Sequence, residues 1–421
     1  MVKSGEERQV VVLGYDMVSP LGTDMETQWR RAAAGESGVG PLTRFPLDET
    51  FPVRIAGEVP DFDPAPYPFL SPRALALWPS PLFRHGLLTV HRALEHAGLE
   101  IAPELAPRTA VTFGSAVGGL DAVLGADRRM RAEGKMPHPC ANPNSCVNMI
   151  GGKVSMLTGA TGPICATITA CATGATSMLM GALLLETGRA DVAICGAVDF
   201  ALVEPIVAGF ATMNGAWTPK PGEPDIAPQS ACRPFSAGRR GFVVSEGSGA
   251  VILSTRAFAR AHGLGMGIAV AGGSMTSDAH HFVAPHLETV RRCMAEAIRD
   301  AGISPADVDA VNAHATSTRI GDRVEYEALR AVFGGKLPPV SANKSLIGHA
   351  MGASSAIESI WAMEGMRRGL LLPTRNYIPD PEMPLDPVAE GVRKRDQEFV
   401  LKNAFGFGGC NTCIVFQRTG P

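Results

Sequence analysis

Short apolar runs that end at a glycine recur along the chain and alternate with longer segments of helical pattern. Three of these runs lie in the first half, at residues 10–13, 110–113 and 192–195. Their length, their β-branched residues and the glycine that follows each of them are typical of buried strands. Leucines and alanines at helical spacing predict a helix at 87–97, and residues 25–34 also favour a helix. Strands that alternate with helices predict a mainly parallel sheet covered on both faces.

The second half of the chain repeats this succession. It favours strands at 267–270, 308–311, 340–342 and 414–416, and helices at 288–301 and from about His349 onward. We therefore expect an α/β protein of two similar halves, residues 1–260 and 261–421, joined near residues 255–265. Two proline-rich stretches, 217–235 and 377–387, are predicted to be loops.

The composition fits this architecture and limits the kinds of partner that the protein could bind. A chain of 421 residues is long for one average domain and suits two fused α/β units, and 45% hydrophobic residues provide a large core. The formal net charge of -3 offers no electrostatic attraction to nucleic acid or to an anionic membrane. We expect neither as a partner.

One long stretch without charged residues, 154–185, needs its own interpretation. Its length alone would suit a membrane span. It is interrupted by Gly159 and by Gly162-Pro163, and it is rich in threonine, serine and cysteine. A strand or turn that leads into a fully buried helix explains it better, so no membrane span is expected. The apolar run 10–13 is too short for the core of a signal peptide.

Nine cysteines are scattered along the chain without the spacing of a disulfide framework. Cys410 and Cys413 form the pattern Cys-Asn-Thr-Cys, but no second pair and no histidine cluster completes a zinc site. An odd number of free thiols in a long chain is typical of a reduced, cytosolic protein, so we expect a cytoplasmic location.

Cys171 is the first candidate for chemistry. It stands among small residues in the segment 164–174, directly before an apolar stretch, 175–185, that favours a helix. A thiol at the start of a helix meets the positive end of the helix dipole, which favours the nucleophilic thiolate. A covalent acyl intermediate could form there. The alternative is a small buried cysteine without a chemical role.

Three later segments, at 311–318, 343–353 and 403–409, carry further candidates. His314 follows an apolar strand, at the edge where open α/β sheets place their ligand sites. His349 begins a helix, whose dipole disfavours the imidazolium, and a neutral imidazole can donate an N–H to a developing oxyanion. The Gly-Phe-Gly-Gly turn of the last segment lets a backbone amide approach a substrate closely. Taken singly, a histidine is more often structural, and this turn lacks the GxGxxG spacing of a dinucleotide site.

Taken together, these segments form a pattern that is specific for one family. They resemble the β-ketoacyl-acyl-carrier-protein synthases, the elongating condensing enzymes of the thiolase superfamily. The resemblance runs from Val10 to Phe416 and includes Ser19-Pro20-Leu21-Gly22 and the block from Arg233 to Gly249. It implies a thiolase-like α/β fold, in which two similar halves give a five-layer αβαβα arrangement.

The resemblance also implies a role for each site residue. Cys171 would be the acyl-accepting nucleophile, with His314 and His349 as the paired catalytic histidines beside Lys344. The amides of Cys171 and Phe407 would form an oxyanion hole, and the Phe407 side chain would gate the site. Glu358 and Phe405 would support the catalytic residues. Thr316 and Thr318 would contact the pantetheine arm, and Val117 would line the acyl pocket.

The implied activity is a decarboxylative Claisen condensation in fatty-acid or polyketide/polyene synthesis. Malonyl-acyl-carrier protein loses carbon dioxide, and the resulting carbanion attacks the acyl chain on Cys171 to give β-ketoacyl-acyl-carrier protein. The resemblance implies an acyl carrier protein as partner, a homodimer or a heterodimer with a second ketosynthase-like chain, and neither a metal nor an organic cofactor. Two alternatives remain open: a non-catalytic subunit similar to chain-length factors, and a thiolase-like acyltransferase with Cys410 as its second cysteine.

The chain departs from the family pattern at several positions. These are Asp16, Arg240, Val283, Ala315 and the pair Ser354-Ser355, where family members usually carry other residues. Between Arg73 and Trp78, Arg73 remains but the usual basic cluster is replaced by apolar residues. We expect an exposed apolar patch there, either for a different docking of the carrier or for contact with another protein. We interpret the chain as a specialised ketosynthase, and its Val117 allows longer acyl chains than the common isoleucine.

Overall fold

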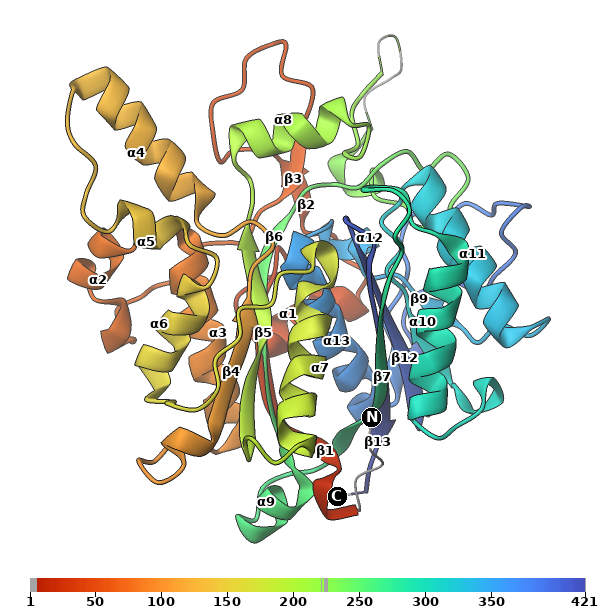
Figure 1. The fold of residues 1–421 in the computed structure, drawn as a ribbon. Helices are drawn as coiled ribbons and strands as arrows, with labels where there is room; N and C mark the ends of the chain where they lie inside the picture. The colour runs from red at the N-terminus through yellow and green to blue at the C-terminus, as the bar shows by residue number, and fades with distance from the viewer. Residues whose placement is uncertain (1–5, 221, 223–225, 421) are drawn as a thin grey trace.

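The computed structural model describes residues 6–220, 222 and 226–420, and nine strands of this part form one mixed sheet (Figure 1). The strand order is β4-β5-β6-β1-β7-β13-β12-β8-β9. The strands are β1 (Val10–Val18), β4 (Thr109–Gly114), β5 (Val192–Phe200), β6 (Glu246–Thr255), β7 (Ile268–Ser277), β8 (Ala310–Asn312), β9 (Val340–Ser341), β12 (Phe399–Gly406) and β13 (Cys410–Arg418). Two further pairs of short strands are β2 (Val39–Pro41) with β3 (Ile55–Gly57), and β10 (Leu370–Leu371) with β11 (Arg393–Lys394).

The sheet has two halves, and helices lie between these halves and on the outer face of each, which gives five layers. Their bounds are α1 (Met25–Ala33), α2 (Pro72–Leu77), α3 (Pro81–Ala97), α4 (Leu120–Glu133), α5 (Ala141–Ser145), α6 (Met149–Thr158), α7 (Thr173–Glu186), α8 (Glu204–Thr212), α9 (Arg256–Ala261), α10 (Leu287–Asp300), α11 (Arg319–Phe333), α12 (Lys344–Ile347) and α13 (Met351–Arg368). α7 and α13 lie between the two halves (Figure 1). α3 and α6 cover the outer face of the first half, and α10 and α11 cover that of the second. This order confirms the five-layer, thiolase-like α/β architecture.

The two halves are built in the same way. In the first half, β1 pairs with β6, β6 with β5 and β5 with β4; in the second, β7 pairs with β13, β13 with β12 and β12 with β8. The halves join where residues 10–12 of β1 pair with β7. The chain passes from β6 to β7 through α9, near the predicted junction at 255–265. The division into residues 1–260 and 261–421 remains a prediction.

The prediction of a mainly parallel sheet is wrong. Only β4 with β5, β12 with β8 and β8 with β9 are parallel, and the other five pairings of the large sheet are antiparallel. Parallel neighbours need a long crossover, whereas antiparallel neighbours can follow each other directly. β12 turns straight back into β13 through residues 407–409, and the sequence pattern did not reveal β12 as a strand.

The other predicted strands and helices are present, and several are longer than predicted. The strand predicted at 10–13 extends to Val18, and the helix predicted at 87–97 begins at Pro81. The stretch 377–387 forms no helix or strand. The described part of 217–235 forms only a 3-10 turn, Pro228–Ser230, while residues 221 and 223–225 of that stretch lie outside the described residues.

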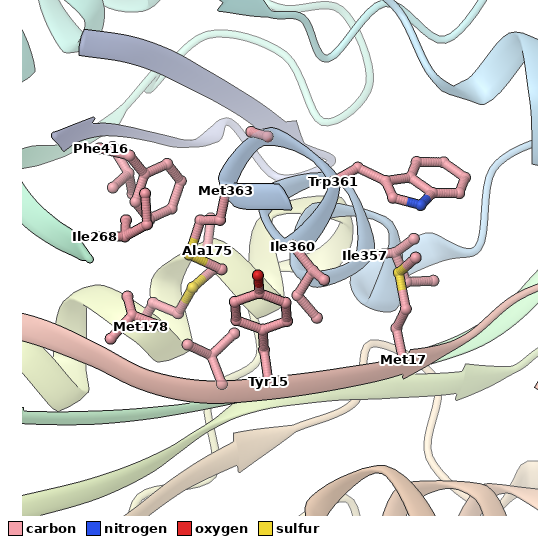
Figure 2. Close-up of a cluster of buried hydrophobic side chains, with 14 of the residues drawn as sticks. Tyr15, Met17, Ala175, Met178, Ile268, Ile357, Ile360, Trp361, Met363 and Phe416 are labelled. Carbon is pink, nitrogen blue, oxygen red and sulfur yellow. The ribbon is translucent and has the colours of Figure 1, made fainter. Parts of the chain in front are cut away.

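A cluster of buried apolar side chains fills the middle layer (Figure 2). Met178 of α7, Ile360 and Met363 of α13 and Tyr15 of β1 belong to it. Because both halves of the sheet pack on α7, this helix has no polar face, which accounts for the uncharged stretch that ends at Leu185. Among the described residues, no helix is long and apolar enough to cross a bilayer.

Candidate active site

Cys171 lies in a tight turn at the start of the buried helix α7. A 3-10 turn, Ala170–Ala172, precedes the helix, and Ala170 has a positive φ of 48°. The Thr173 hydroxyl donates to the Ala170 carbonyl at 2.7 Å and fixes this turn. The Cys171 side chain is buried and faces the end of β12, where a side chain on Gly406 would lie 2.3 Å from the Thr169 carbonyl oxygen. Glycine at position 406 therefore allows β12 to approach the thiol.

His349 lies directly against this thiol. It follows Gly348, whose φ of 75° is left-handed, and it precedes α13. Its Nε2 lies 3.0 Å from the Cys171 Sγ, and its Nδ1 lies 2.9 Å from the Ser354 Oγ. Burial and the nearby Lys344 ammonium hold the pKa of His349 well below its usual value. The imidazole is therefore neutral, as its position at a helix start predicts.

His314 follows β8, and its backbone is held on both sides. Its amide donates to Glu325 Oε1 at 2.9 Å, and its carbonyl accepts from Lys344 Nζ at 2.6 Å. The His314 ring meets the His349 ring edge-on at 5.8 Å and the Phe405 ring at 5.6 Å, both between centroids. Burial, with the charge of Lys344, also holds the pKa of His314 well below its usual value.

A buried ionic network supports both histidines. Glu358 accepts from Lys344 Nζ at 2.6 Å through Oε1 and from Lys402 Nζ at 2.7 Å through Oε2. All three side chains are at most 1% exposed. The charges of both lysines contribute to the lowered pKa values of His314 and His349. Sequence reasoning missed Lys402; a lysine inside the otherwise apolar run before Asn403 was the signal that could have found it.

The thiol itself is less acidic than its place at a helix start suggests. Burial raises the pKa of Cys171 to about 11, against the opposing influence of Lys344 and of the backbone N–H groups of Phe407 and Cys171. Such a shift corresponds to a cost of about 3 kcal/mol for the thiolate, whereas a helix terminus stabilises an anion by roughly 0.3–1 kcal/mol. The helix start therefore favours the Cys171 thiolate less than burial disfavours it. The backbone N–H groups of Cys171 and Phe407 both lie at the sulfur, and their role as an oxyanion hole remains a prediction.

Two adjoining cavities meet at Cys171. The larger has a volume of about 620 Å³ and contains His314, His349, Phe405, Thr316 and Thr318 among its lining residues. It reaches the surface beside Ile320, which is 61% exposed. The hydroxyls of Thr316 and Thr318 lie 3.0 Å apart on its wall.

The smaller cavity, of about 190 Å³, is mostly apolar and has Val117 on its wall. Four residues line both cavities, namely Cys171, Phe242, His349 and Phe407. Their side chains, which surround the reactive sulfur, form the boundary between the two cavities. A reactant that enters from the surface side can thus place a second, apolar portion beyond Phe407.

Asp199 is a second residue that sequence reasoning missed. It lies next to the last residue of β5 as a fully buried carboxylate. It accepts from the Ser115 hydroxyl at 2.7 Å and from the amides of Ala116 and Val117, both at 3.0 Å. Burial raises its pKa to about 6, and these hydrogen bonds oppose the shift. Asp199 therefore fixes the loop that forms one wall of the smaller cavity.

Within the described part of the chain, one group of side chains could hold a metal ion. It consists of Cys171, His314 and His349, whose ligand atoms lie within 4.8 Å of one another. A thiol and two neutral imidazoles are ligands of a soft ion such as Zn²⁺. That the protein works without a metal remains a prediction.

The apolar residues of the helix near residue 73 are half-buried rather than fully exposed, except for Ala76, which is exposed. In α2, Arg73 is exposed, but Leu75 and the adjacent Trp78 pack against the outer core of the first half. Trp78 meets the Phe83 ring at 4.9 Å between centroids. Leu75 and Trp78 thus cover the core with one side and remain partly open to solvent with the other, so the surface there is less apolar than expected.

Two of the unusual residues, Arg240 and Val283, line the larger cavity. Ala315 donates its amide to Glu325 Oε2 at 2.7 Å, next to the His314 backbone. Asp16 lies in β1, far from the thiol in sequence, and burial raises its pKa to about 8. Nothing in the structure explains a carboxyl at that position.

Comparisons with known proteins agree with this geometry. The family model of the β-ketoacyl synthase N-terminal domain matches residues 7–259, and that of the β-ketoacyl synthase C-terminal domain matches residues 268–378. A 3-oxoacyl-[acyl-carrier-protein] synthase 2 of Staphylococcus aureus (strain COL) is 33% identical over 419 residues, which cover 98% of this chain and 99% of that protein.

Two solved structures have the same fold over nearly the whole chain. One is a type II polyketide synthase acyl-carrier protein in complex with its ketosynthase bound to the hexaketide, with a TM-score of 0.88 and 26% identity over 98% of this chain and 100% of that chain. The other is the ishigamide ketosynthase/chain length factor, with a TM-score of 0.88 and 30% identity over the same shares of the two chains. With both domain models and a full-length relative matched, this chain belongs to the β-ketoacyl synthase family and is an acyltransferase.

Proposed function

We propose that this protein extends an acyl chain by decarboxylative Claisen condensation with malonyl-acyl-carrier protein. The observation that carries the proposal is the junction of the two cavities, where His349 Nε2 lies 3.0 Å from the Cys171 Sγ and His314 lies beside it. A nucleophile, two neutral N–H donors and two backbone amides meet there. These are the groups that acyl transfer followed by enolate formation requires.

In the first half-reaction, the Cys171 sulfur attacks the thioester carbonyl of an acyl-carrier protein. The backbone N–H groups of Cys171 and Phe407, which approach the sulfur, stabilise the oxyanion. The carrier leaves as a thiolate and takes up the proton that the thiol releases. The acyl chain remains on Cys171 and lies in the smaller cavity, where Val117 forms part of the wall.

In the second half-reaction, malonyl-carrier protein occupies the larger cavity. The neutral imidazoles of His314 and His349 donate to the malonyl thioester carbonyl, so that loss of carbon dioxide leaves a stabilised enolate. The enolate carbon forms a bond with the acyl carbonyl carbon, and the Cys171 thiolate is released. The β-ketoacyl product, two carbons longer, stays on the carrier.

The residues around this chemistry have supporting roles. The hydroxyls of Thr316 and Thr318 contact the pantetheine arm in the larger cavity, and Phe407 closes the passage to the smaller one. Lys344, held by Glu358, fixes the carbonyl of His314 and keeps the histidines neutral. Phe405 packs on the His314 ring and limits its rotation.

The partners of this chain follow from the same proposal. The two structural relatives contain, by their titles, an acyl-carrier protein bound to its ketosynthase and a ketosynthase with a chain length factor. We propose an acyl carrier protein as the donor of both substrates, and a second thiolase-fold chain, identical or ketosynthase-like, as the dimer partner. Because Cys171, His314, His349 and Lys344 are all present and assembled, a purely non-catalytic subunit is not the function that the site supports.

The test is acylation of Cys171. We expect incubation with an acyl-acyl-carrier protein to add the mass of the acyl group to the peptide that contains Cys171, and subsequent malonyl-carrier protein to remove it as a product two carbons longer. The Cys171→Ala variant should show neither change. Absence of the adduct in the wild-type protein, together with no release of carbon dioxide from malonyl-carrier protein, would contradict the proposal.

A further inference from the structure

Ser354 occupies the first turn of α13 directly beneath the His349 ring. It is 1% exposed, and its Oγ lies 2.9 Å from His349 Nδ1 and 2.8 Å from the backbone nitrogen of Ala350. These two are the contacts of the Ser354 hydroxyl within the described part of the chain. The hydroxyl therefore bridges a backbone amide and the far side of the imidazole that faces Cys171.

The direction of the hydrogen bonds follows from what each group can do. A backbone N–H only donates, so the Ala350 amide uses a lone pair of the Ser354 oxygen. If His349 Nδ1 donated to the second lone pair, the buried hydroxyl hydrogen would have no acceptor among the described residues. The arrangement that pairs every hydrogen therefore has the hydroxyl donating to His349 Nδ1. A neutral imidazole that accepts at Nδ1 carries its hydrogen on Nε2.

We infer that Ser354 is a positioning residue that fixes the hydrogen of His349 on Nε2, the atom that faces Cys171. The inference deepens the proposed function and rests on it, because there His349 serves as an N–H donor to the malonyl thioester carbonyl. In the other tautomer, Nε2 would present a lone pair to the site and could not donate to the enolate oxygen. Ser354 thus selects a hydrogen-bond donor over a base or a metal ligand at this position.

The neighbouring Ser355 provides a matched comparison within the same turn. It is equally buried, but its Oγ accepts from the Ala175 amide at 3.1 Å and donates to the Gly352 carbonyl at 3.2 Å. Its hydroxyl contacts no imidazole. Removal of either hydroxyl leaves a buried backbone N–H without this partner, while only that of Ser354 frees the His349 ring.

The test measures the tautomer directly. In protein labelled with nitrogen-15 in its histidine rings, the His349 signals, identified by their loss in His349→Gln, should show an unprotonated Nδ1 and a protonated Nε2. In Ser354→Ala we expect a mixture of tautomers, and in Ser355→Ala the wild-type pattern. An unchanged His349 pattern in Ser354→Ala, or the same change in Ser355→Ala, would overturn the inference.

Kinetics provide the second readout. We expect Ser354→Ala to lower kcat for malonyl decarboxylation roughly tenfold with KM nearly unchanged, less than the loss of 10²–10³ for removal of a donor outright. Ser354→Thr, which keeps a hydroxyl, should recover part of this loss, and Ser355→Ala should stay near wild type. An equal loss in both alanine variants would contradict the inference. If the wild-type protein does not decarboxylate malonyl-carrier protein at all, the proposed function fails, and the nitrogen signals still decide the role of Ser354.

Discussion

At the residue scale, opposing influences act on one sulfur atom. Burial and the charge of Asp199 disfavour the Cys171 thiolate, while the Lys344 ammonium and two backbone N–H groups favour it, and burial is the largest effect. The charge that the reaction creates at this sulfur and at the neighbouring carbonyl oxygen therefore forms when a substrate is bound rather than before.

This balance predicts how Cys171 reacts with iodoacetamide in the absence of substrate. Burial raises the pKa of the folded thiol to about 11, so the thiolate fraction below that pH rises with pH. We expect the alkylation rate at Cys171 to increase roughly tenfold per pH unit between about pH 7 and 9, because only the thiolate reacts. Peptide mass spectrometry measures this rate, with the exposed Cys146 as internal control. A rate at Cys171 that is constant from pH 7 upward would contradict the account.

Cys171 and the two histidines could be predicted at this scale because their motifs lie in short segments. The protonation of the thiol could not, since it depends on burial by residues far away in the sequence. The contacts of Glu358 with Lys402 and of Ser115 with Asp199 span 44 and 84 positions, which no local pattern contains. Ser354 could be recognised as unusual in the sequence, but its partner atom could not.

At the scale of the elements, β12 and α13 deliver most of the supporting groups. β12 supplies Lys402 and leads to Phe407, and α13 supplies Glu358 and Ser354. Strands marked by apolar runs were predictable, whereas β12 was not, because Lys402 and Asn403 interrupt its apolar pattern. Both side chains are buried because each is paired with a buried carboxylate, Lys402 with Glu358 and Asn403 with Glu325. The polar residues that β12 contributes to the site are thus the reason why its sequence does not look like a buried strand.

The ionic contact between β12 and α13 makes a prediction about stability. Removal of Lys402 in Lys402→Met leaves Glu358 with one of its two buried cationic partners. We expect the free energy of unfolding to fall by about 3 kcal/mol, as for other buried pairs that lose one partner. Chemical denaturation measures it, with Lys336→Met, at an exposed position, as the control expected within about 0.5 kcal/mol of wild type. Equal stability of the two variants would show that Lys402 does not hold this network together.

At the scale of the whole molecule, the first half-sheet has an open edge at β4. Ile164 bridges to Val111 and extends the sheet beyond β4, and several large apolar side chains around this segment are exposed. Ile164 and Ile168 are 54% and 52% exposed, and Met156 is 72% exposed. Exposed apolar side chains along an open sheet edge are typical of a subunit interface. The two-half architecture was predictable from the sequence, but this edge required the strand order.

We therefore predict that Ile168→Arg reduces the mass of the particle in solution to that of one chain. Size-exclusion chromatography with light scattering measures it, and Met136→Arg, at a position that is 84% exposed and distant in sequence, should keep the wild-type mass. A wild-type particle of two identical chains supports the homodimer, and dimerisation only with a second ketosynthase-like chain supports the heterodimer. A mass that Ile168→Arg leaves unchanged would place the interface elsewhere.

In the proposed reaction, Cys171 carries the acyl chain while His314 and His349 drive decarboxylation as neutral donors. The most direct measurement follows carbon dioxide release and chain extension together in the Cys171→Ala variant, supplied with malonyl- and acyl-acyl-carrier protein. We expect carbon dioxide release to continue, because both histidines remain in place, while no β-ketoacyl product forms. Formation of the extended product without Cys171 would rule out its role as acyl carrier, and complete loss of carbon dioxide release in a folded variant would rule out decarboxylation by the two histidines alone.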